Sequence, residues 1–240
     1  MTSLRKLAPA AMLAAATVFA GLPALAQTAT TEPATPAPAQ NTPAPAQSTP
    51  APADQATAPA ATPAILPDHV LGSETAPVTV VEYASFTCPH CAAFNKDVWP
   101  KMKAEYVDTG KVKFIQREVY FDQFGLWAGV LANCAPAEKY YPISDMLFEE
   151  QKTWIGDGQP QSIADNLKKI GIKAGLTNEQ MDACFADKAK VEQLIATFQK
   201  NAGDDKVNAT PSFFIGGQAV SNGPWEDIKK VIDEKLAAAK

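Results

Sequence analysis

The stretch that decides the fold runs Val78-Thr79-Val80-Val81-Glu82-Tyr83 and then, after a short loop, Cys88-Pro89-His90-Cys91. Its first part is a β-branched run that predicts a buried strand. Beyond the motif, apolar residues recur at helical spacing: Phe94, Val98, Met102 and Tyr106. Pro100 should kink that helix. Residues 111–119 have the pattern of a second strand, so the order predicts a βαβ unit with parallel strands.

The rest of the chain turns helical and then returns to strands. Apolar residues at helical spacing predict five helices between about 121 and 204, and Thr177 with Gln180 forms a capping box for the fourth. Residues 212–215 and 218–220 flank Gly216-Gly217, the pattern of a two-residue hairpin, and a final helix starts near Pro224. The predicted fold is α/β, in the order β-α-β, an inserted all-helical domain, then β-β-α.

The motif Cys88-Pro89-His90-Cys91 carries the candidate chemistry. At the start of a helix, unpaired N–H groups and the helix dipole stabilise a Cys88 thiolate and lower its pKa. Cys91, one turn further on, is close enough to form a disulfide with Cys88 and is expected to be the more buried sulfur. Pro89 suits the first helical turn. His90 interacts favourably with the thiolate but not with the thiol, so it favours the reduced pair and makes the disulfide a stronger oxidant.

Two other uses of this motif remain as alternatives. Cys-x-x-Cys is half of many zinc sites, but zinc needs two further ligands, and only His69 is near in sequence besides His90. A purely structural disulfide is the second alternative. We expect no metal and no cofactor other than the Cys88–Cys91 disulfide itself.

Glu82 lies six positions before Cys88 inside the predicted buried strand. Burial there would raise the pKa of the carboxyl group, which suits a proton shuttle for the buried Cys91 thiol. The alternative is a partly exposed acid without a role.

The N-terminus indicates export. Arg5 and Lys6 precede an apolar run from Leu7 to about Ala20, and Ala24-Leu25-Ala26 has the small residues that signal peptidase requires. We expect a signal peptide at residues 1–26 and a mature protein outside the cytoplasm, where disulfides persist. The alternative is a retained membrane anchor, although the run is short for a spanning helix.

Residues 27–66 are almost wholly Ala, Pro, Thr and Gln, which predicts a disordered, semi-stiff spacer. A docking peptide for a partner is the alternative. Residues 67–240 have the composition of a globular domain. Loss of Arg5 and Lys6 changes the net charge from −5 to −7, and an acidic chain without a basic stripe argues against nucleic acid as a partner. We expect a monomer.

Two further cysteines, Cys134 and Cys184, lie on the apolar faces of two predicted helices. In an oxidising compartment they are expected to form a structural disulfide. The alternative is a pair of free buried thiols that behave as small hydrophobic side chains.

The segment Val81–Cys91 resembles the active-site segment of the DsbA-like thiol oxidases of the bacterial periplasm. The resemblance extends through the helical insert to Ala209–Gly217, so it covers the chain from about Pro67 to its end. It implies a thioredoxin fold, a cis Pro211 beside the disulfide, an acid at the position of Glu82, and strong oxidising power. Extended substrates are expected to bind along Thr210 and Pro211 as an added strand.

The same resemblance implies folding exported proteins with cysteines as substrates, a mixed disulfide with Cys88 as the intermediate, and a DsbB-like membrane quinone reductase as the partner that reoxidises the pair. Thr210 departs from the pattern, because the best-known oxidases carry Val there, whereas Thr is commoner in reductases and isomerases. A reductase or isomerase is therefore the first alternative. A non-catalytic thioredoxin-fold chaperone that binds peptides is the second, and the intact cysteine pair argues against it.

Overall fold

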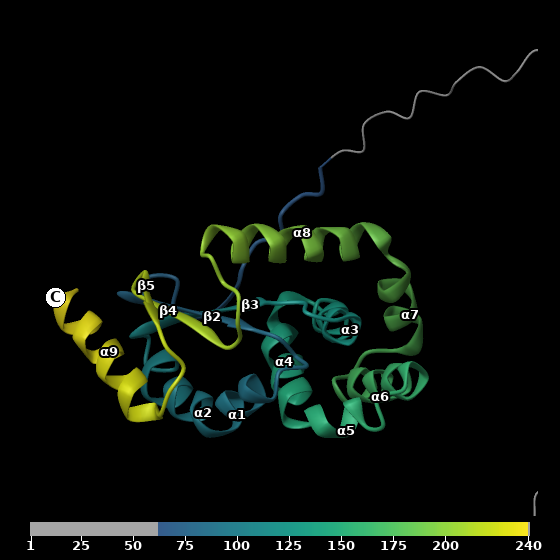
Figure 1. Cartoon of the computed structure of the whole chain (residues 1–240), viewed down its shortest axis with the longest axis horizontal. Helices are drawn as coiled ribbons and strands as arrows, with labels where there is room; N and C mark the ends of the chain where they lie inside the picture. Colours follow the sequence, from purple (N-terminus) through teal and green to yellow (C-terminus); the bar gives the residue numbers. More distant parts are fainter. Residues whose placement is uncertain (1–61, 240) are drawn as a thin grey trace, which may run out of the picture. The chain divides into compact units, whose positions relative to one another are not determined.

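The computed structural model describes residues 62–239 (Figure 1). The predicted signal peptide at 1–26 and all but the last few residues of the predicted spacer at 27–66 lie outside the described residues. Within them, five strands form one sheet in the order β1-β3-β2-β4-β5. The strands are β1 (His69–Gly72), β2 (Val78–Ala84), β3 (Val112–Glu118), β4 (Ser212–Ile215) and β5 (Gln218–Val220).

The predicted βαβ unit and hairpin are confirmed. β2 and β3 are parallel, in register from Val78 opposite Val112 to Ala84 opposite Glu118. β4 pairs with β2 and β5 pairs with β4, both antiparallel. The hairpin turn at Gly216-Gly217 has positive φ at both residues (54° and 78°), a conformation that favours glycine. β1, antiparallel to β3 at the sheet edge, was not predicted.

The helices fall into three groups along the chain. Between β2 and β3 lie α1 (Pro89–Asp97), α2 (Trp99–Met102) and a π-helical turn at Lys103–Val107; the last helix is α9 (Trp225–Ala238). Between β3 and β4 lie α3 (Gln123–Ala132), a 3-10 turn at Ala137–Lys139, α4 (Tyr140–Glu149), α5 (Gln151–Ile155), α6 (Pro160–Lys173), α7 (Asn178–Ala186) and α8 (Lys188–Asp204). The expected kink appears as a break between α1 and α2, one residue before Trp99-Pro100.

Helices cover both faces of the sheet (Figure 1). α1 and α9 pack on the face that carries Val80 and Phe213, where the main hydrophobic core lies. The C-terminal part of α8 covers the opposite face, where Tyr83 and Ala202 are buried together. α3, α4 and α6 pack on one another beside the sheet and contribute their apolar faces to the same main core.

One ion-pair cluster ties the start of the described chain to the α8 face of the sheet. Arg117 on β3 contacts both carboxylate oxygens of Asp68 at 2.9 Å and also donates to Asp205 at 3.0 Å and to the hydroxyl of Tyr83 at 2.7 Å. The backbone amide of Leu66 donates to Oγ1 of Thr197 on α8 at 2.8 Å. The chain therefore enters the domain along α8.

Candidate active site

Cys88 is the N-cap residue of α1, at the end of the loop that follows β2. Its amide donates to the carbonyl oxygen of Ser85 at 3.0 Å, which turns the chain into the helix, and its carbonyl oxygen accepts the amide of Ala92 at 3.2 Å. Pro89 occupies the first turn, where a missing N–H costs no hydrogen bond. Cys88 is half-buried and Cys91 is fully buried, and both are free thiols in this structure.

The surroundings of Cys88 favour its thiolate. Partial burial alone would raise the pKa of Cys88, but hydrogen bonds from the Thr210 side chain and from the backbone of Cys91 and His90 outweigh it, so the pKa lies below its ordinary value. This is the effect expected at a helix N-terminus. Within the part of the chain that the structure describes, no hydrogen bond joins the exposed His90 ring to Cys88, and His90 acts on the sulfur through its backbone N–H.

Cys91 and Glu82 form a buried pair whose surroundings favour the protonated, neutral forms of both groups. Burial, and then the charge of Glu82, raise the pKa of Cys91 well above its ordinary value. Burial, followed by the charges of Asp145 and Cys88, raises the pKa of Glu82 to about 8. Glu82 is 3% exposed, and its Oε1 has no hydrogen-bond partner among the described residues. An acid in this state can hold a proton at neutral pH and release it to a neighbouring base.

Thr210 contacts Cys88, and Pro211 follows Thr210 in the chain. The Thr210–Pro211 peptide bond is cis, and Pro211 immediately precedes β4. In the thiol form, Sγ of Cys88 donates to the carbonyl oxygen of Thr210 at 3.4 Å. The topology thus brings the two sequence-predicted segments together although 122 positions separate them.

Two side chains of the helical insert hold the loop before Cys88, and sequence reasoning missed both. Nε2 of the buried Gln151 donates to the carbonyl oxygens of Phe86 (2.8 Å) and Cys88 (2.9 Å). Asp122, the N-cap of α3, accepts the amides of the first turn of its own helix through Oδ1 and the hydroxyl of Thr87 through Oδ2 at 2.6 Å. Asp122 could have been predicted as an N-cap, because an Asp directly before an apolar helical pattern is typical of that position. No sequence pattern indicates a role for Gln151.

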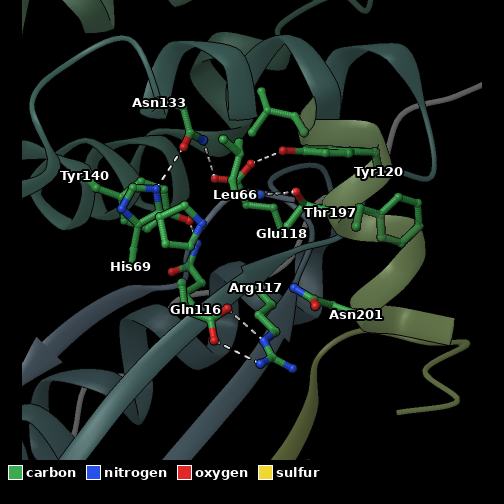
Figure 2. A pocket seen from close by; sticks show the side chains of 14 residues that line it. Leu66, His69, Gln116, Arg117, Glu118, Tyr120, Asn133, Tyr140, Thr197 and Asn201 are labelled. Atoms are coloured by element: carbon green, nitrogen blue, oxygen red, sulfur yellow. Dashed lines mark hydrogen bonds and ion pairs between the residues drawn. The ribbon is translucent and has the colours of Figure 1, made fainter. Parts of the chain in front are cut away.

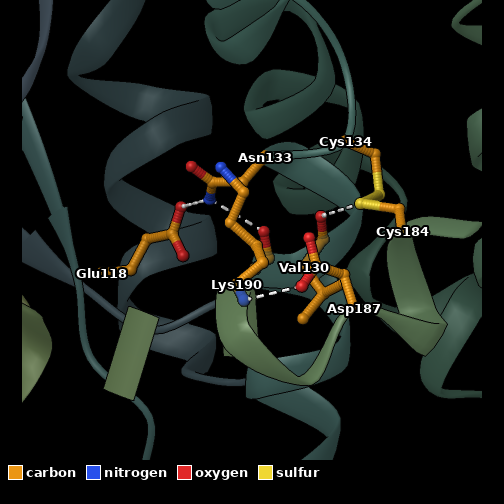
Figure 3. The surroundings of a disulfide bond; sticks show 8 residues. Glu118, Val130, Asn133, Cys134, Cys184, Asp187 and Lys190 are labelled. Carbon is orange, nitrogen blue, oxygen red and sulfur yellow. Dashed lines mark hydrogen bonds between the residues drawn. A yellow bond between two sulfur atoms is a disulfide. The ribbon is translucent and has the colours of Figure 1, made fainter. Parts of the chain in front are cut away.

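Cys134 and Cys184 are joined in a disulfide, with sulfurs 2.07 Å apart and Cα atoms 5.7 Å apart (Figure 3). Cys184 lies on α7, whereas Cys134 lies two residues beyond the end of α3 rather than within it. The disulfide stands next to Asn133, whose amide nitrogen donates to Glu118 at 2.9 Å. α3 begins beside the active-site loop, where its N-cap Asp122 binds Thr87, and the disulfide lies beyond its other end.

A partly buried polar cluster surrounds Glu118 at the end of β3 (Figure 2). Tyr120 donates to Glu118, and Asn133 Nδ2 donates to it at 2.9 Å while Asn133 Oδ1 lies 2.8 Å from Nε2 of His69. Burial raises the pKa of Glu118 to about 7, although hydrogen bonds from Tyr120, Tyr140 and Asn133 oppose the shift. The adjoining cavity of about 40 Å³ has room for water but not for an organic substrate.

Among residues 62–239, no group of three or more His, Cys, Asp and Glu side chains is arranged to hold a metal ion. Within the same residues, every helix is too short or too polar to cross a bilayer.

A family model described as thioredoxin matches residues 65–234. The chain belongs to the thioredoxin family. A putative protein-disulfide oxidoreductase of Rickettsia bellii is 30% identical over 174 residues, which are 72% of this chain and 66% of that protein, just under two thirds of its length. Disulfide bond formation protein D of Bacillus subtilis is 30% identical over 184 residues, 72% of this chain and 79% of that protein.

Among solved structures, the thioredoxin-family chain is similar to Wolbachia pipientis alpha-DsbA1, with a TM-score of 0.65 and 28% identity over 72% of this chain and 92% of that one. Residues 65–234, which the family model matches, include the whole sheet and the helical insert. This thioredoxin-family protein is therefore DsbA-like, and the fold expected from the sequence, a thioredoxin fold with an inserted all-helical domain, is confirmed.

Proposed function

We propose that this DsbA-like chain is a thiol:disulfide oxidoreductase that donates the Cys88–Cys91 disulfide to exported proteins as they fold. The observation that carries the proposal is the asymmetry of the two sulfurs: the pKa of the accessible Cys88 is lowered, whereas that of the buried Cys91 is raised. Such a pair has one sulfur that leaves well and one that is protected. The names of the relatives support the same reaction class.

The reaction proceeds in two exchanges. A substrate thiolate attacks Sγ of Cys88, forms a mixed disulfide, and breaks the Cys88–Cys91 bond, so Cys91 leaves with the electron pair. Glu82, protonated at neutral pH, supplies the proton that makes Cys91 a thiol. A second substrate thiolate then attacks the substrate sulfur of the mixed disulfide and releases the Cys88 thiolate. The substrate dithiol loses two electrons, and the Cys88–Cys91 pair gains them.

Thr210 and Pro211 are the proposed substrate contacts. The carbonyl oxygen of Thr210 lies 3.4 Å from Sγ of Cys88, so a main-chain amide beside a substrate cysteine can pair with it while the sulfurs react. Main-chain pairing does not depend on sequence and suits a broad range of unfolded substrates.

We place the protein in the periplasm as a monomer, with a DsbB-like membrane quinone reductase as the partner that restores the disulfide. The support is the signal peptide predicted at residues 1–26 and the DsbA-like similarity of the domain. Nucleic acid is not among the proposed partners.

The reduction potential of the Cys88–Cys91 pair, measured at equilibrium in glutathione buffers, tests the proposal. We expect a value well above that of thioredoxin at about −270 mV and toward that of DsbA at about −120 mV. A value near −270 mV would establish a reductase, one of the alternatives that the presence of Thr210 before Pro211 favours. Thr210 nevertheless supports an oxidant here, because its side chain stabilises the Cys88 thiolate and therefore the reduced pair.

A further inference from the structure

The loop between β2 and α1 is held mainly by the helical insert. The ring of Phe86 packs on Phe148 of α4 with centroids 4.9 Å apart, and the Thr87 hydroxyl is bound to Asp122 of α3. The carbonyl groups of Phe86 and Cys88 converge on one nitrogen, Nε2 of Gln151, the first residue of α5. A primary amide has two N–H donors on one planar nitrogen, so it can serve both carbonyl oxygens at once.

The position of Gln151 is unusual for its residue type. Its side chain is 5% exposed, in a run of polar residues from Glu149 to Lys152. Burying a polar side chain is unfavourable unless it forms hydrogen bonds, and those of Gln151 go to backbone atoms on either side of Thr87. The carbonyl group of Cys88 also accepts the first bond of α1 from Ala92, so Gln151 binds the N-cap peptide of the helix that activates the sulfur.

We propose that Gln151 is a positioning residue for Cys88: by holding the Phe86 and Cys88 carbonyl groups it keeps the N-cap residue oriented so that Sγ faces the N–H groups of α1. The insert thereby sets the reactivity of the cysteine pair. This inference rests on the proposed function only in its consequence for substrate oxidation. The orientation itself is a property of the folded protein and is measured without a substrate.

Gln151→Met removes both donors and keeps the length of the side chain. We expect the pKa of Cys88, taken from the pH dependence of its alkylation by iodoacetamide, to rise by about one unit, which is ~tenfold less thiolate at a fixed pH below the pKa. The equilibrium constant with glutathione should shift toward a less oxidising pair. Asn166→Leu is the matched control, since Asn166 Nδ2 donates to the backbone carbonyls of Thr153 and Trp154 and does not touch the loop.

Gln151→Glu is the second variant and nearly preserves shape. Its carboxylate lacks the donors and adds a negative charge near the sulfur, so the pKa of Cys88 should rise further than in Gln151→Met. An unchanged pKa and an unchanged glutathione equilibrium in a folded Gln151→Met or Gln151→Glu protein would overturn the proposal, as would equal shifts in Asn166→Leu.

A measurement on the unaltered protein tests the role of Gln151 even if both variants fail to fold. The NMR signals of the Gln151 side-chain NH₂ group should shift when the Cys88–Cys91 pair is reduced, because the group is bonded to the Cys88 peptide. Signals that stay in place would contradict the proposal. The proposed function fails separately, if the unaltered protein does not oxidise a reduced dithiol peptide although its Cys88 pKa is low.

Discussion

Two sulfurs one helical turn apart are in opposite environments. Cys88 lies at the N-terminus of α1 among backbone N–H donors, whereas Cys91 is buried beside Glu82. Only the thiolate is nucleophilic, so the lowered pKa of Cys88 and the raised pKa of Cys91 decide which sulfur reacts.

Iodoacetamide at mildly acidic pH is therefore expected to alkylate Cys88 of the reduced protein at least about tenfold faster than Cys91, the ratio that one pKa unit provides. Peptide mapping by mass spectrometry after short exposures gives the two rates. Equal rates, or faster labelling of Cys91, would remove Cys88 as the nucleophile.

Glu82 predicts a pH-dependent stability. Its pKa is about 8 in the folded protein but ordinary, near 4.5, in the unfolded chain, so the folded state holds an extra proton between these values. Stability contributed by that proton is complete below about pH 4.5 and is lost as pH rises through about 8. Glu82→Gln avoids the loss, and in the reduced protein its advantage over the parent should grow across this window to at most about 5 kcal/mol.

Urea denaturation of both reduced proteins from pH 4.5 to pH 8.5 measures the difference. Glu192→Gln removes an exposed carboxyl group on α8 and serves as the control. Parallel pH profiles for Glu82→Gln and the parent would show that Glu82 is ionised at neutral pH and is not the proton donor.

The cysteines and Glu82 could be predicted because each belongs to a local pattern with a physical meaning, whereas the placement of Thr210–Pro211 beside the disulfide was implied by the resemblance to DsbA-like oxidases. The sequence did not reveal Gln151, since a polar residue among Glu149, Glu150 and Lys152 has the pattern of an exposed turn. Its burial is decided by the docking of α5 on the β2–α1 loop, which is a tertiary contact.

At the scale of the elements, length and turn signals decided what could be predicted. The seven-residue strands β2 and β3 and the helices α6, α8 and α9, each of fourteen residues or more, carry clear periodicity. β1 has four residues and α5 has five, too few for a period to show. β4 and β5 are also short, but the turn residues Gly216-Gly217 between them mark the hairpin. The capping box at Thr177 and Gln180 was predictable because it is local, and both of its hydrogen bonds are present.

α3 depends on a glycine. A methyl group on Gly129 would approach Oε2 of Glu118 to 2.5 Å and the ring of Tyr120 to 2.6 Å, two members of the polar cluster in Figure 2. Gly129→Ala should therefore destabilise the protein by about 1–3 kcal/mol, the usual cost of overpacking. Gly203→Ala in α8, where nothing lies within 4 Å, should instead stabilise it by up to about 1 kcal/mol through helix propensity.

Chemical denaturation of the parent and the two variants at one pH measures both changes in the free energy of unfolding. If Gly129→Ala were as stable as Gly203→Ala, the side chains of Glu118 and Tyr120 could move aside for the methyl group without loss of stability, and the prediction would be wrong.

The disulfide between Cys134 and Cys184 links the end of α3 to α7 across a sequence separation of 50. Closing a loop of that length stabilises the fold by roughly 4 kcal/mol in the chain-entropy estimate. In a native, air-oxidised Cys88→Ser/Cys91→Ser protein we expect no thiols to be labelled, and two after unfolding with reductant. Two labelled thiols without reductant, under native or denaturing conditions, would show that these cysteines are free.

For the whole molecule, redox state and stability are linked. Interactions that favour the Cys88 thiolate exist only in the folded, reduced protein, so the reduced form should unfold at higher urea than the oxidised form. The difference should be about 1.4 kcal/mol for every 30 mV by which the folded pair is more oxidising than the same cysteines in the unfolded chain. Denaturation curves of both forms measure it, and a more stable oxidised form would indicate a reductase.

The order of elements along the chain was enough to predict the fold class, because strand, helix and hairpin patterns permit few arrangements. It was not enough to predict that Asp122 before α3 and Gln151 on α5 both bind the loop between β2 and α1. Those contacts depend on how the helical insert packs against the sheet domain.

The entry of the chain along α8 has a practical consequence. Leu66 and Asp68 are bound on the face of the sheet that α8 covers, whereas Cys91 packs on the face that α1 covers. A solid support coupled to a residue ahead of Ile65 would therefore hold the domain by its rear surface and leave the reactive sulfur accessible. Beads prepared in this way would form an orientated, reusable column for oxidative refolding of recombinant proteins.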